Sequence, residues 1–367
     1  MLYLHMPHAR NGFSACSPRS ARLILIVTGV LVAFCIGVTQ SPLKSGFADA
    51  PPRGTSDVQL YQAVCEQVHE NHGYYLVNNH ELRSRGYPTG SVFNWRAPVL
   101  FWLLGSFPNL IWGHLLITGL AGLAMIWTFD LLFRERGMRA ACCGGLLLAG
   151  AFLPCVIGEL FVMPEVWAGT LILLSLLALA RKDIAWGIFF GIAATFIREL
   201  ALPYTVLGFL YAVFHRQWRE SAGWLVGIVL FGLFYAWHIE QVQQWIRTGD
   251  VVHQEGWFRL GGTAFVISTV QMNVFLLLLP QWVAAIYFPL SLLGFASWRT
   301  KTGEPLGLAI AGFVVMFAII GQPFNQYWGS LIAPLFCLGA GQAPLAIREL
   351  WNATKISPAS NAQPLVA

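Results

Sequence analysis

The stretch ARLILIVTGVLVAFCIGVTQ at residues 21–40 decides the fold class, because it is almost entirely apolar. A helix needs about 20 mostly apolar residues to cross the roughly 30 Å of hydrocarbon in a bilayer. A backbone in lipid must satisfy its own hydrogen bonds, so such a stretch becomes an α-helix. Its apolar core is longer than that of a usual signal peptide. We therefore interpret it as an uncleaved membrane anchor.

Comparable stretches recur along the rest of the chain. Of the 367 residues, 56% are hydrophobic and 11% are charged, whereas soluble domains carry about 25% charged residues. The sequence thus predicts an all-α, polytopic transmembrane bundle of about ten spans. We place the spans at 21–40, 109–133, 139–157, 163–180, 184–197, 200–214, 221–239, 280–298, 305–321 and 328–346. Residues 97–107 suit an interfacial helix, and 262–279 fit either an interfacial helix or a further span, giving ten to twelve.

The distribution of charge predicts the orientation. With the N-terminus in the cytoplasm, the inner loops and tails hold 14 Lys and Arg against 6 Asp and Glu, and the outer segments hold 8 against 11. An excess of Lys and Arg marks the cytoplasmic side. The prediction is a cytoplasmic tail at 1–20, a transmembrane domain at 21–350 and a cytoplasmic tail at 351–367. The basic inner loops account for the net positive charge of the chain, so the charge does not indicate nucleic acid as a partner.

The longest outer loop, 41–96, changes character after a Pro- and Gly-containing start. Ser56 suits the N-cap of a helix, and Asp57 in the first turn suits the helix dipole. Leu60, Tyr61 and Val64 then follow at helical spacing. The pattern predicts an amphipathic helix that presents Asp57 and Tyr61 on one face at the membrane surface. A purely capping role for Asp57 remains open. A second outer or interfacial segment is expected at 240–279.

Further ionisable residues are expected at the outer ends of spans. Glu159 and Glu165 lie at the two ends of one short outer turn. The pair Arg198–Glu199 interrupts an otherwise apolar stretch. Ionisable groups at membrane depth are costly and are functional candidates for that reason. Glu165 could equally be a first-turn acid, and the Arg198–Glu199 pair could be a turn solvated by headgroups. At the inner side, Asp130 is expected to pair with Arg134 four residues later.

Two more outer segments carry polar side chains. Arg96 begins the sequence Arg-Ala-Pro before the predicted interfacial helix. The turn at 322–328 offers hydrogen bonds and a stacking surface for a sugar through Asn325, Gln326, Tyr327 and Trp328, although it could also be an ordinary interfacial turn. We predict no metal site and no cofactor, and a requirement for a divalent cation is left open.

Together, Ser56 to Tyr61, Arg96 to Pro98, Glu165 and the many spans resemble the GT-C superfamily of membrane glycosyltransferases. That group includes protein O-mannosyltransferase-like and aminoarabinose-transferase-like enzymes. The resemblance implies transfer of a sugar from a polyprenyl-phosphate donor to a lipid or glycan acceptor at the outer face of a bacterial inner membrane.

The resemblance also implies roles for individual residues. Asp57 would be the catalytic base, and Glu165, or less well Glu159, the second acid. The lipid phosphate would be held by Arg96 or Arg198. The substrate-binding residues would be Tyr61, Arg96, Arg198, Glu199, Asn325, Tyr327 and Trp328.

The sequence departs from the family pattern in two respects. Val58 follows Asp57 where many members carry a second acid, and no soluble outer domain follows the last span. The chain would then be either a compact member or one whose activity is changed or lost. The main alternative is a transporter or flippase of a lipid-linked sugar, whose polar sites are expected at mid-membrane. A non-catalytic membrane scaffold is the third interpretation.

Overall fold

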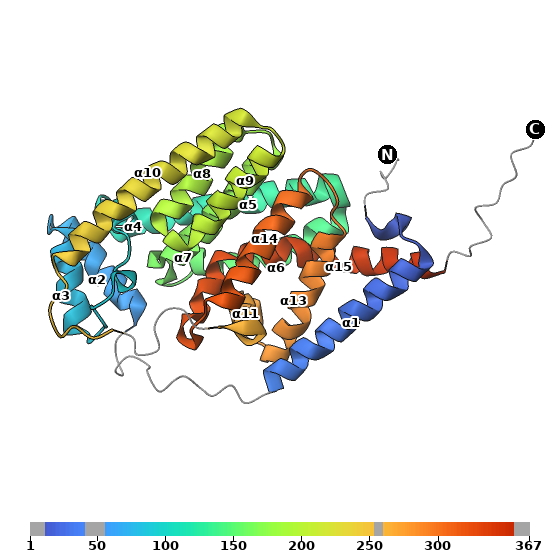
Figure 1. Ribbon diagram of the computed structural model, residues 1–367, viewed down its shortest axis with the longest axis horizontal. Coiled ribbons are helices and arrows are strands. Elements are labelled where there is room, and N and C mark those ends of the chain that lie inside the picture. Colours follow the sequence, from blue (N-terminus) through green and yellow to red (C-terminus); the bar gives the residue numbers. More distant parts are fainter. Residues whose placement is uncertain (1–11, 41–55, 253–259, 356–367) are drawn as a thin grey trace, which may run out of the picture.

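The computed structural model describes residues 12–40, 56–252 and 260–355, and these form helices and connecting turns without any β-strand (Figure 1). Four helices are long and apolar enough to cross a membrane, by length and composition. They are α1 (Pro18–Gln40), α5 (Leu110–Arg136), α6 (Met138–Val156) and α10 (Trp218–Gln243). All four coincide with predicted spans. The fold class, an apolar helical bundle, is as predicted.

A fifth long segment is bent. The 3₁₀ helix η6 (Pro323–Leu331) and α15 (Ala333–Thr354) would together pass as one span, with an angle of 66° between Phe324–Leu331 and Ala333–Thr354. The last predicted span, 328–346, falls across this bend. Helix α15 also continues to Thr354, so the tail predicted to begin at 351 starts as helix.

Five predicted spans correspond to helices of 13 to 17 residues. Such helices are about 20–26 Å long, which is shorter than the hydrocarbon core of a bilayer. The ten crossings are therefore not established by helix length. These shorter helices are α7 (Pro164–Ala180), α8 (Ile184–Ile197), α9 (Leu202–Phe214, preceded by η5 at Glu199–Ala201), α13 (Gln281–Ala296) and α14 (Gly303–Ile319).

The remaining helices are short and connect the others. Ser56 caps α2 as predicted, and Leu60, Tyr61 and Val64 are buried on its apolar face. The stretch 262–279 is broken into two pieces, α11 and α12, neither long enough to span. Helix α3 was not predicted. The short elements are η1 (Phe13–Ala15), α2 (Asp57–His69), α3 (Tyr74–Ser84), η3 (Val92–Asn94), α4 (Val99–Gly105), η4 (Leu160–Val162), α11 (Gly262–Val270) and α12 (Val274–Leu277).

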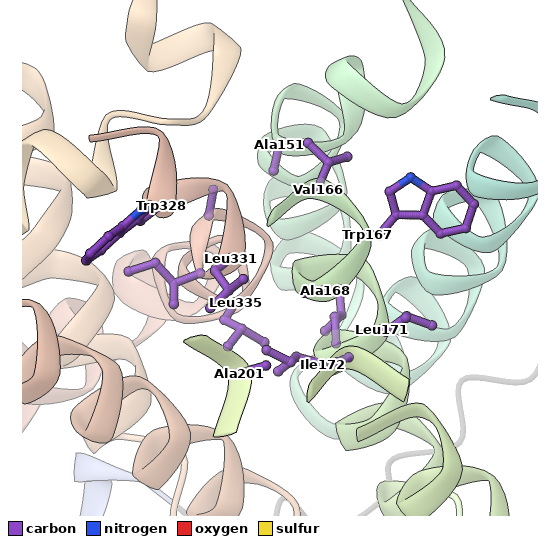
Figure 2. Packing of buried hydrophobic residues seen from close by; sticks show 14 of the residues in the cluster. Ala151, Val166, Trp167, Ala168, Leu171, Ile172, Ala201, Trp328, Leu331 and Leu335 are labelled. Atoms are coloured by element: carbon purple, nitrogen blue, oxygen red, sulfur yellow. The ribbon is translucent and has the colours of Figure 1, made fainter. Parts of the chain in front are cut away.

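Helix α7 lies at the centre of the bundle. It is apolar on all sides, and almost every one of its residues is buried, as expected for a helix surrounded by others. Figure 2 shows Leu331 and Leu335 meeting α7 near Ala168 and Ile172. A Cβ at Gly169 would collide with the carbonyl oxygen of Ser330. Glycine at this position therefore lets η6 lie directly against α7.

Helix α1 is the opposite case. Only Ala21 and Cys35 are buried in it, while large apolar side chains such as Ile26, Val30 and Phe34 are more than half exposed. Contiguous apolar surface of this kind marks a face that meets lipid or a partner. Together with the other long apolar helices, it assigns the protein to a membrane.

Figure 1 shows the two ends of the bundle. Helices α2 and α3 lie at one end, and the first residues of α1 and the last residues of α15 lie at the other. Phe13 N donates to Glu349 Oε2 over 2.8 Å, which joins the N-terminal segment to α15. Arg181 bridges to Asp130 at 3.1 Å, and the predicted Asp130–Arg134 pair is confirmed at 2.7 Å. Arg136 bonds to Ser297 Oγ at 2.6 Å, and Arg299 lies over the ring of Phe13. The predicted inner loops at 134–139, 181–183 and 299–304 therefore lie at the same end as Phe13 and Glu349.

Candidate functional site

The carboxylate of Asp57 stands at the start of α2, at the end of the bundle opposite the basic loops. Ser56 Oγ accepts a hydrogen bond from Gln59 N at 3.2 Å, which fixes the first turn. Tyr87 donates its hydroxyl to Asp57 Oδ1 at 2.7 Å. In the part of the chain that the structure describes, only this oxygen of the partly exposed carboxylate is engaged. Asp57 is thus oriented and still accessible.

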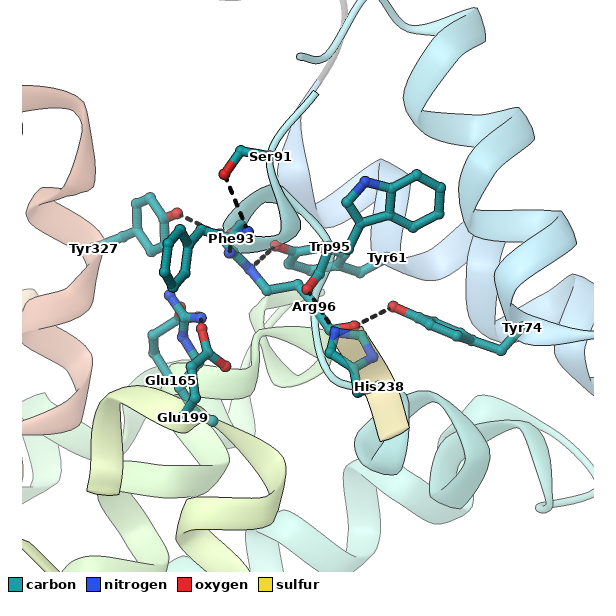
Figure 3. A network of polar contacts seen from close by, with 11 residues as sticks. Tyr61, Tyr74, Ser91, Phe93, Trp95, Arg96, Glu165, Glu199, His238 and Tyr327 are labelled. Atoms are coloured by element: carbon teal, nitrogen blue, oxygen red, sulfur yellow. Dashed lines mark hydrogen bonds and ion pairs between the residues drawn. The ribbon is translucent and has the colours of Figure 1, made fainter. Parts of the chain in front are cut away.

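Arg96 is held by neutral oxygens (Figure 3). Its Nε donates to the hydroxyl of Tyr61 at 2.9 Å, Nη2 to the hydroxyl of Tyr327 at 3.0 Å, and Nη1 to Phe93 O at 3.1 Å. Tyr74 donates to the Arg96 carbonyl at 2.6 Å and fixes its backbone. No carboxylate of the described residues forms an ion pair with Arg96. The guanidinium therefore keeps its charge and two further N–H donors.

The phenols near Arg96 stay protonated at neutral pH. Burial raises the pKa of Tyr61 well above its ordinary value, and the effect of burial exceeds the opposing effect of Arg96. Burial and the charge of Asp57 raise the pKa of Tyr87. Tyr61 is therefore a neutral acceptor that adds no negative charge beside Arg96, and Tyr87 remains a donor to Asp57.

Arg198 is held very differently from Arg96. Its Nε lies 2.7 Å from Glu165 Oε1, Nη1 contacts Glu199 Oε1, and both Arg198 and Glu165 are fully buried. This trio is not a headgroup-solvated turn, because η5 and α9 fold Arg198 inward against the first turn of α7. Two carboxylates against one guanidinium leave one excess negative charge. Arg96 lies close enough to interact with both acids, so it balances that charge at longer range.

The polar turn before α15 completes the cluster. Tyr327 bonds to Arg96, and the guanidinium carbon of Arg198 lies 6.0 Å from the ring centre of Trp328. Asn325 Nδ2 and Trp328 Nε1 are buried, and neither has a hydrogen-bond partner among the described residues. The same holds for Oε2 of Glu165 and of Glu199. Donors and acceptors are thus both present where η6 meets α7 and η5.

A second layer of residues supports the loop that carries Arg96. His238 of α10 bonds to the hydroxyl of Tyr75 at 2.8 Å through Nδ1 and to Trp95 O at 3.2 Å through Nε2. Figure 3 shows this buried histidine beside the backbone of Trp95, the residue before Arg96. Sequence reasoning missed Tyr87, His238 and the two tyrosines of α3, because nothing in their local pattern distinguishes them from ordinary interfacial aromatics.

Hydrogen bonds join Tyr61, Arg96 and Tyr327, and Asp57 lies one helical turn before Tyr61 on α2. Arg198 joins Glu165, Glu199 and Trp328 in a second group. Asn325 is buried in η6 three residues before Trp328. Glu159 is exposed at the turn before η4 and joins neither group. No family model, curated protein or solved structure matches the chain.

Proposed function

We propose that this chain is a membrane glycosyltransferase that moves a sugar from a polyprenyl-phosphate donor to a lipid or glycan acceptor. The observation that carries the proposal is an accessible carboxylate, Asp57, one helical turn before Tyr61, whose hydroxyl holds a guanidinium, Arg96, that forms no ion pair with a described carboxylate. A base for an acceptor hydroxyl and a cation for a phosphate are the two groups that this reaction requires. The structure supports this chemistry by placing both groups at one end of a membrane bundle.

In the proposed reaction, the oxygen of an acceptor hydroxyl attacks the anomeric carbon of the sugar. Asp57 takes the proton of that hydroxyl as the attack proceeds. The bond between that carbon and the phosphate oxygen breaks, and the electron pair leaves with the polyprenyl phosphate. Arg96 stabilises the phosphate through the two N–H groups that its present contacts leave available. Preorganised charge of this kind requires no rearrangement during the reaction.

The two arginines take different roles in this proposal. Arg198 is already paired with Glu165 and Glu199, so a phosphate there would meet acids. We therefore assign the phosphate to Arg96, and we assign to Glu165 the role of holding Arg198 beneath the site. A buried ion pair of this kind is costly to break, and it joins α7 to the segment between α8 and η5. The unpartnered groups of Asn325 and Trp328 suit sugar hydroxyls.

The topology supports an outer location for the site. We propose ten crossings: the four long helices, the bent η6–α15 segment and the five shorter apolar helices. With ten crossings both termini lie on one side, which agrees with the contact between Phe13 and Glu349. The basic loops then face the cytoplasm, and Asp57 and Arg96 face the outer surface of a bacterial inner membrane.

Reconstitution into liposomes tests the class of function. Purified full-length protein is given a polyprenyl-phosphate hexose with a radiolabelled sugar, together with an extract of envelope lipids and glycans. Transfer releases free polyprenyl phosphate and moves the label to an acceptor. Movement of the intact sugar lipid across the bilayer without release would instead identify a flippase and reject the transferase.

A further inference from the structure

A cavity lies at the opposite end of the bundle from Asp57. It has a volume of about 760 Å³ and lies between α7, α8, α9, α10 and α14. Its lining along α9 extends from Tyr204 to His215, which corresponds to a depth of about 16 Å at 1.5 Å per helical residue. Ligand sites in proteins commonly have volumes of about 300–1,000 Å³. The cavity is therefore large enough to hold a ligand.

The deep part of this cavity is apolar. Leu176, Leu207 and the indole of Trp224 line it, and the Tyr204 hydroxyl at its base is already bonded to Ser175 Oγ at 2.6 Å. The depth therefore offers contact surface to a hydrocarbon and little to a polar molecule. Ile184 and Leu308 line its edge and are 40% and 39% exposed, so the rim is continuous with apolar surface that would face lipid.

The mouth of the cavity carries two positive and two negative side chains. Lys182 from the α7–α8 turn and Lys301 from the α13–α14 turn face it, together with Glu220 of α10 and Glu304 of α14. None of these four is in an ion pair with a described residue. Lys182 has a φ of 67°, a left-handed conformation that suits Gly or Asn better than lysine. The turn thus carries a cation at a position where Gly or Asn would be less strained.

We propose that this cavity binds one membrane phospholipid with a zwitterionic headgroup, its acyl chain lying between α9, α10 and α14. The two lysines bind the phosphate, and Glu220 and Glu304 accept hydrogen bonds from the amine. Two positive and two negative side chains match a headgroup with one charge of each sign, and the two acids disfavour a headgroup with net negative charge. The proposal depends on the membrane location and not on the transferase reaction.

Native mass spectrometry of the full-length protein in mild detergent tests this inference. Delipidated protein is titrated with phosphatidylethanolamine, phosphatidylglycerol and polyprenyl phosphate in separate series. We expect one phosphatidylethanolamine per chain, bound about tenfold more tightly than the two anionic lipids, as a charged hydrogen bond gained or lost would give. Equal or tighter binding of phosphatidylglycerol or polyprenyl phosphate would overturn the assignment of the headgroup.

Two variants locate the lipid. Lys182→Asn with Lys301→Gln removes both cations, and asparagine tolerates the left-handed conformation at 182. Ala309→Phe fills the cavity from α14, where Ala309 is 2% exposed. We expect each to reduce phosphatidylethanolamine binding by about tenfold or more, and Lys355→Gln, at the same end but outside the cavity, to leave it unchanged. Unchanged binding in the two cavity variants, or equal loss in the Lys355 variant, would reject the site.

Discussion

The Nε atom of Arg96 lies 2.9 Å from the hydroxyl oxygen of Tyr61, and this hydrogen bond joins the loop before α4 to the helix that carries Asp57. Tyr61 is one helical turn after Asp57, so the two side chains share a face of α2. The bond therefore ties Arg96, which forms no ion pair with a described carboxylate, to the helix that carries Asp57.

Replacing Asp57 tests the proposed base. Asp57→Asn keeps an oxygen that can accept from Tyr87, so the fold is expected to remain intact. A base contributes about 100- to 10,000-fold to such a reaction, and we expect a loss of sugar transfer within that range. Glu159→Gln is the matched control, since Glu159 is an exposed acid at the same end. Full activity of the Asp57 variant would exclude it as the base.

Replacing Arg96 with lysine separates charge from geometry. Lysine keeps the positive charge, but its single ammonium lacks the planar fork with which Arg96 reaches Tyr61 and Tyr327 from two nitrogens and still offers N–H groups to a phosphate. We expect a loss of about 10- to 100-fold in kcat/KM for the lipid donor, as for a lost charged hydrogen bond. Arg247→Lys, an exposed arginine at the same end, provides the control. Equal donor kinetics in the two variants would argue against phosphate binding by Arg96.

The buried trio predicts a specific pattern of stability. Arg198→Met leaves two acids without their cation, and such a change costs about 3–5 kcal/mol. The loss of stability is measured as a decrease in the thermal unfolding midpoint of the protein in detergent. The double variant Arg198→Met with Glu165→Met removes the deeply buried acid as well, and we expect it to recover most of that loss. If the double variant is no more stable than the single one, packing rather than charge accounts for the role of Arg198.

Gly169 predicts how η6 is positioned. A valine there would collide with the backbone of Ser330 and Leu331, which cannot move independently of η6. We expect Gly169→Val to displace Tyr327 and Trp328, lower the thermal midpoint and abolish sugar transfer. Gly119→Val, on α5 with open space around its Cβ position, is the control. Retention of both properties in the Gly169 variant would show that η6 adjusts without cost.

Acid is expected to release the segment after α10. Arg83 bonds to Asp250 at 2.6 Å and 2.8 Å, and these bonds, with the Arg247 backbone N–H, hold the pKa of Asp250 well below its usual range. The stabilisation is complete above the unfolded pKa of about 3.9 and is lost as the pH falls from there through the folded value. The rate of backbone hydrogen exchange in residues 245–252 measures this loss, and we expect it to rise as the pH falls.

The Asp250→Asn variant is the control for that experiment. The amide does not titrate, so we expect faster exchange at neutral pH and no further increase attributable to this residue in acid. A wild-type segment that exchanges equally fast at pH 7 and pH 3, after correction for intrinsic rates, would contradict the proposed link between Arg83 and Asp250.

Local pattern and composition determined much about this protein. The apolar runs gave the helical class and the bounds of most helices, and the Ser56–Asp57 signal gave the start of α2, because caps and periodicity act within a few residues. The sequence also marked Asp57, Arg96, Glu165 and Arg198, since charge is conspicuous in an apolar chain. It did not show that five of the ten predicted spans are helices of only 13 to 17 residues, because these segments are as apolar as the long helices.

The tertiary structure alone decided how these charges are used. Arg96 and Arg198 looked equivalent in the sequence, yet Arg198 is neutralised by Glu165 and Glu199 while Arg96 is bound only by neutral oxygens. The partners of each arginine come from segments far apart in the chain, such as α2 and η6 for Arg96. Which cation remains available for a ligand thus depends on long-range packing, and no pattern of neighbouring residues encodes it.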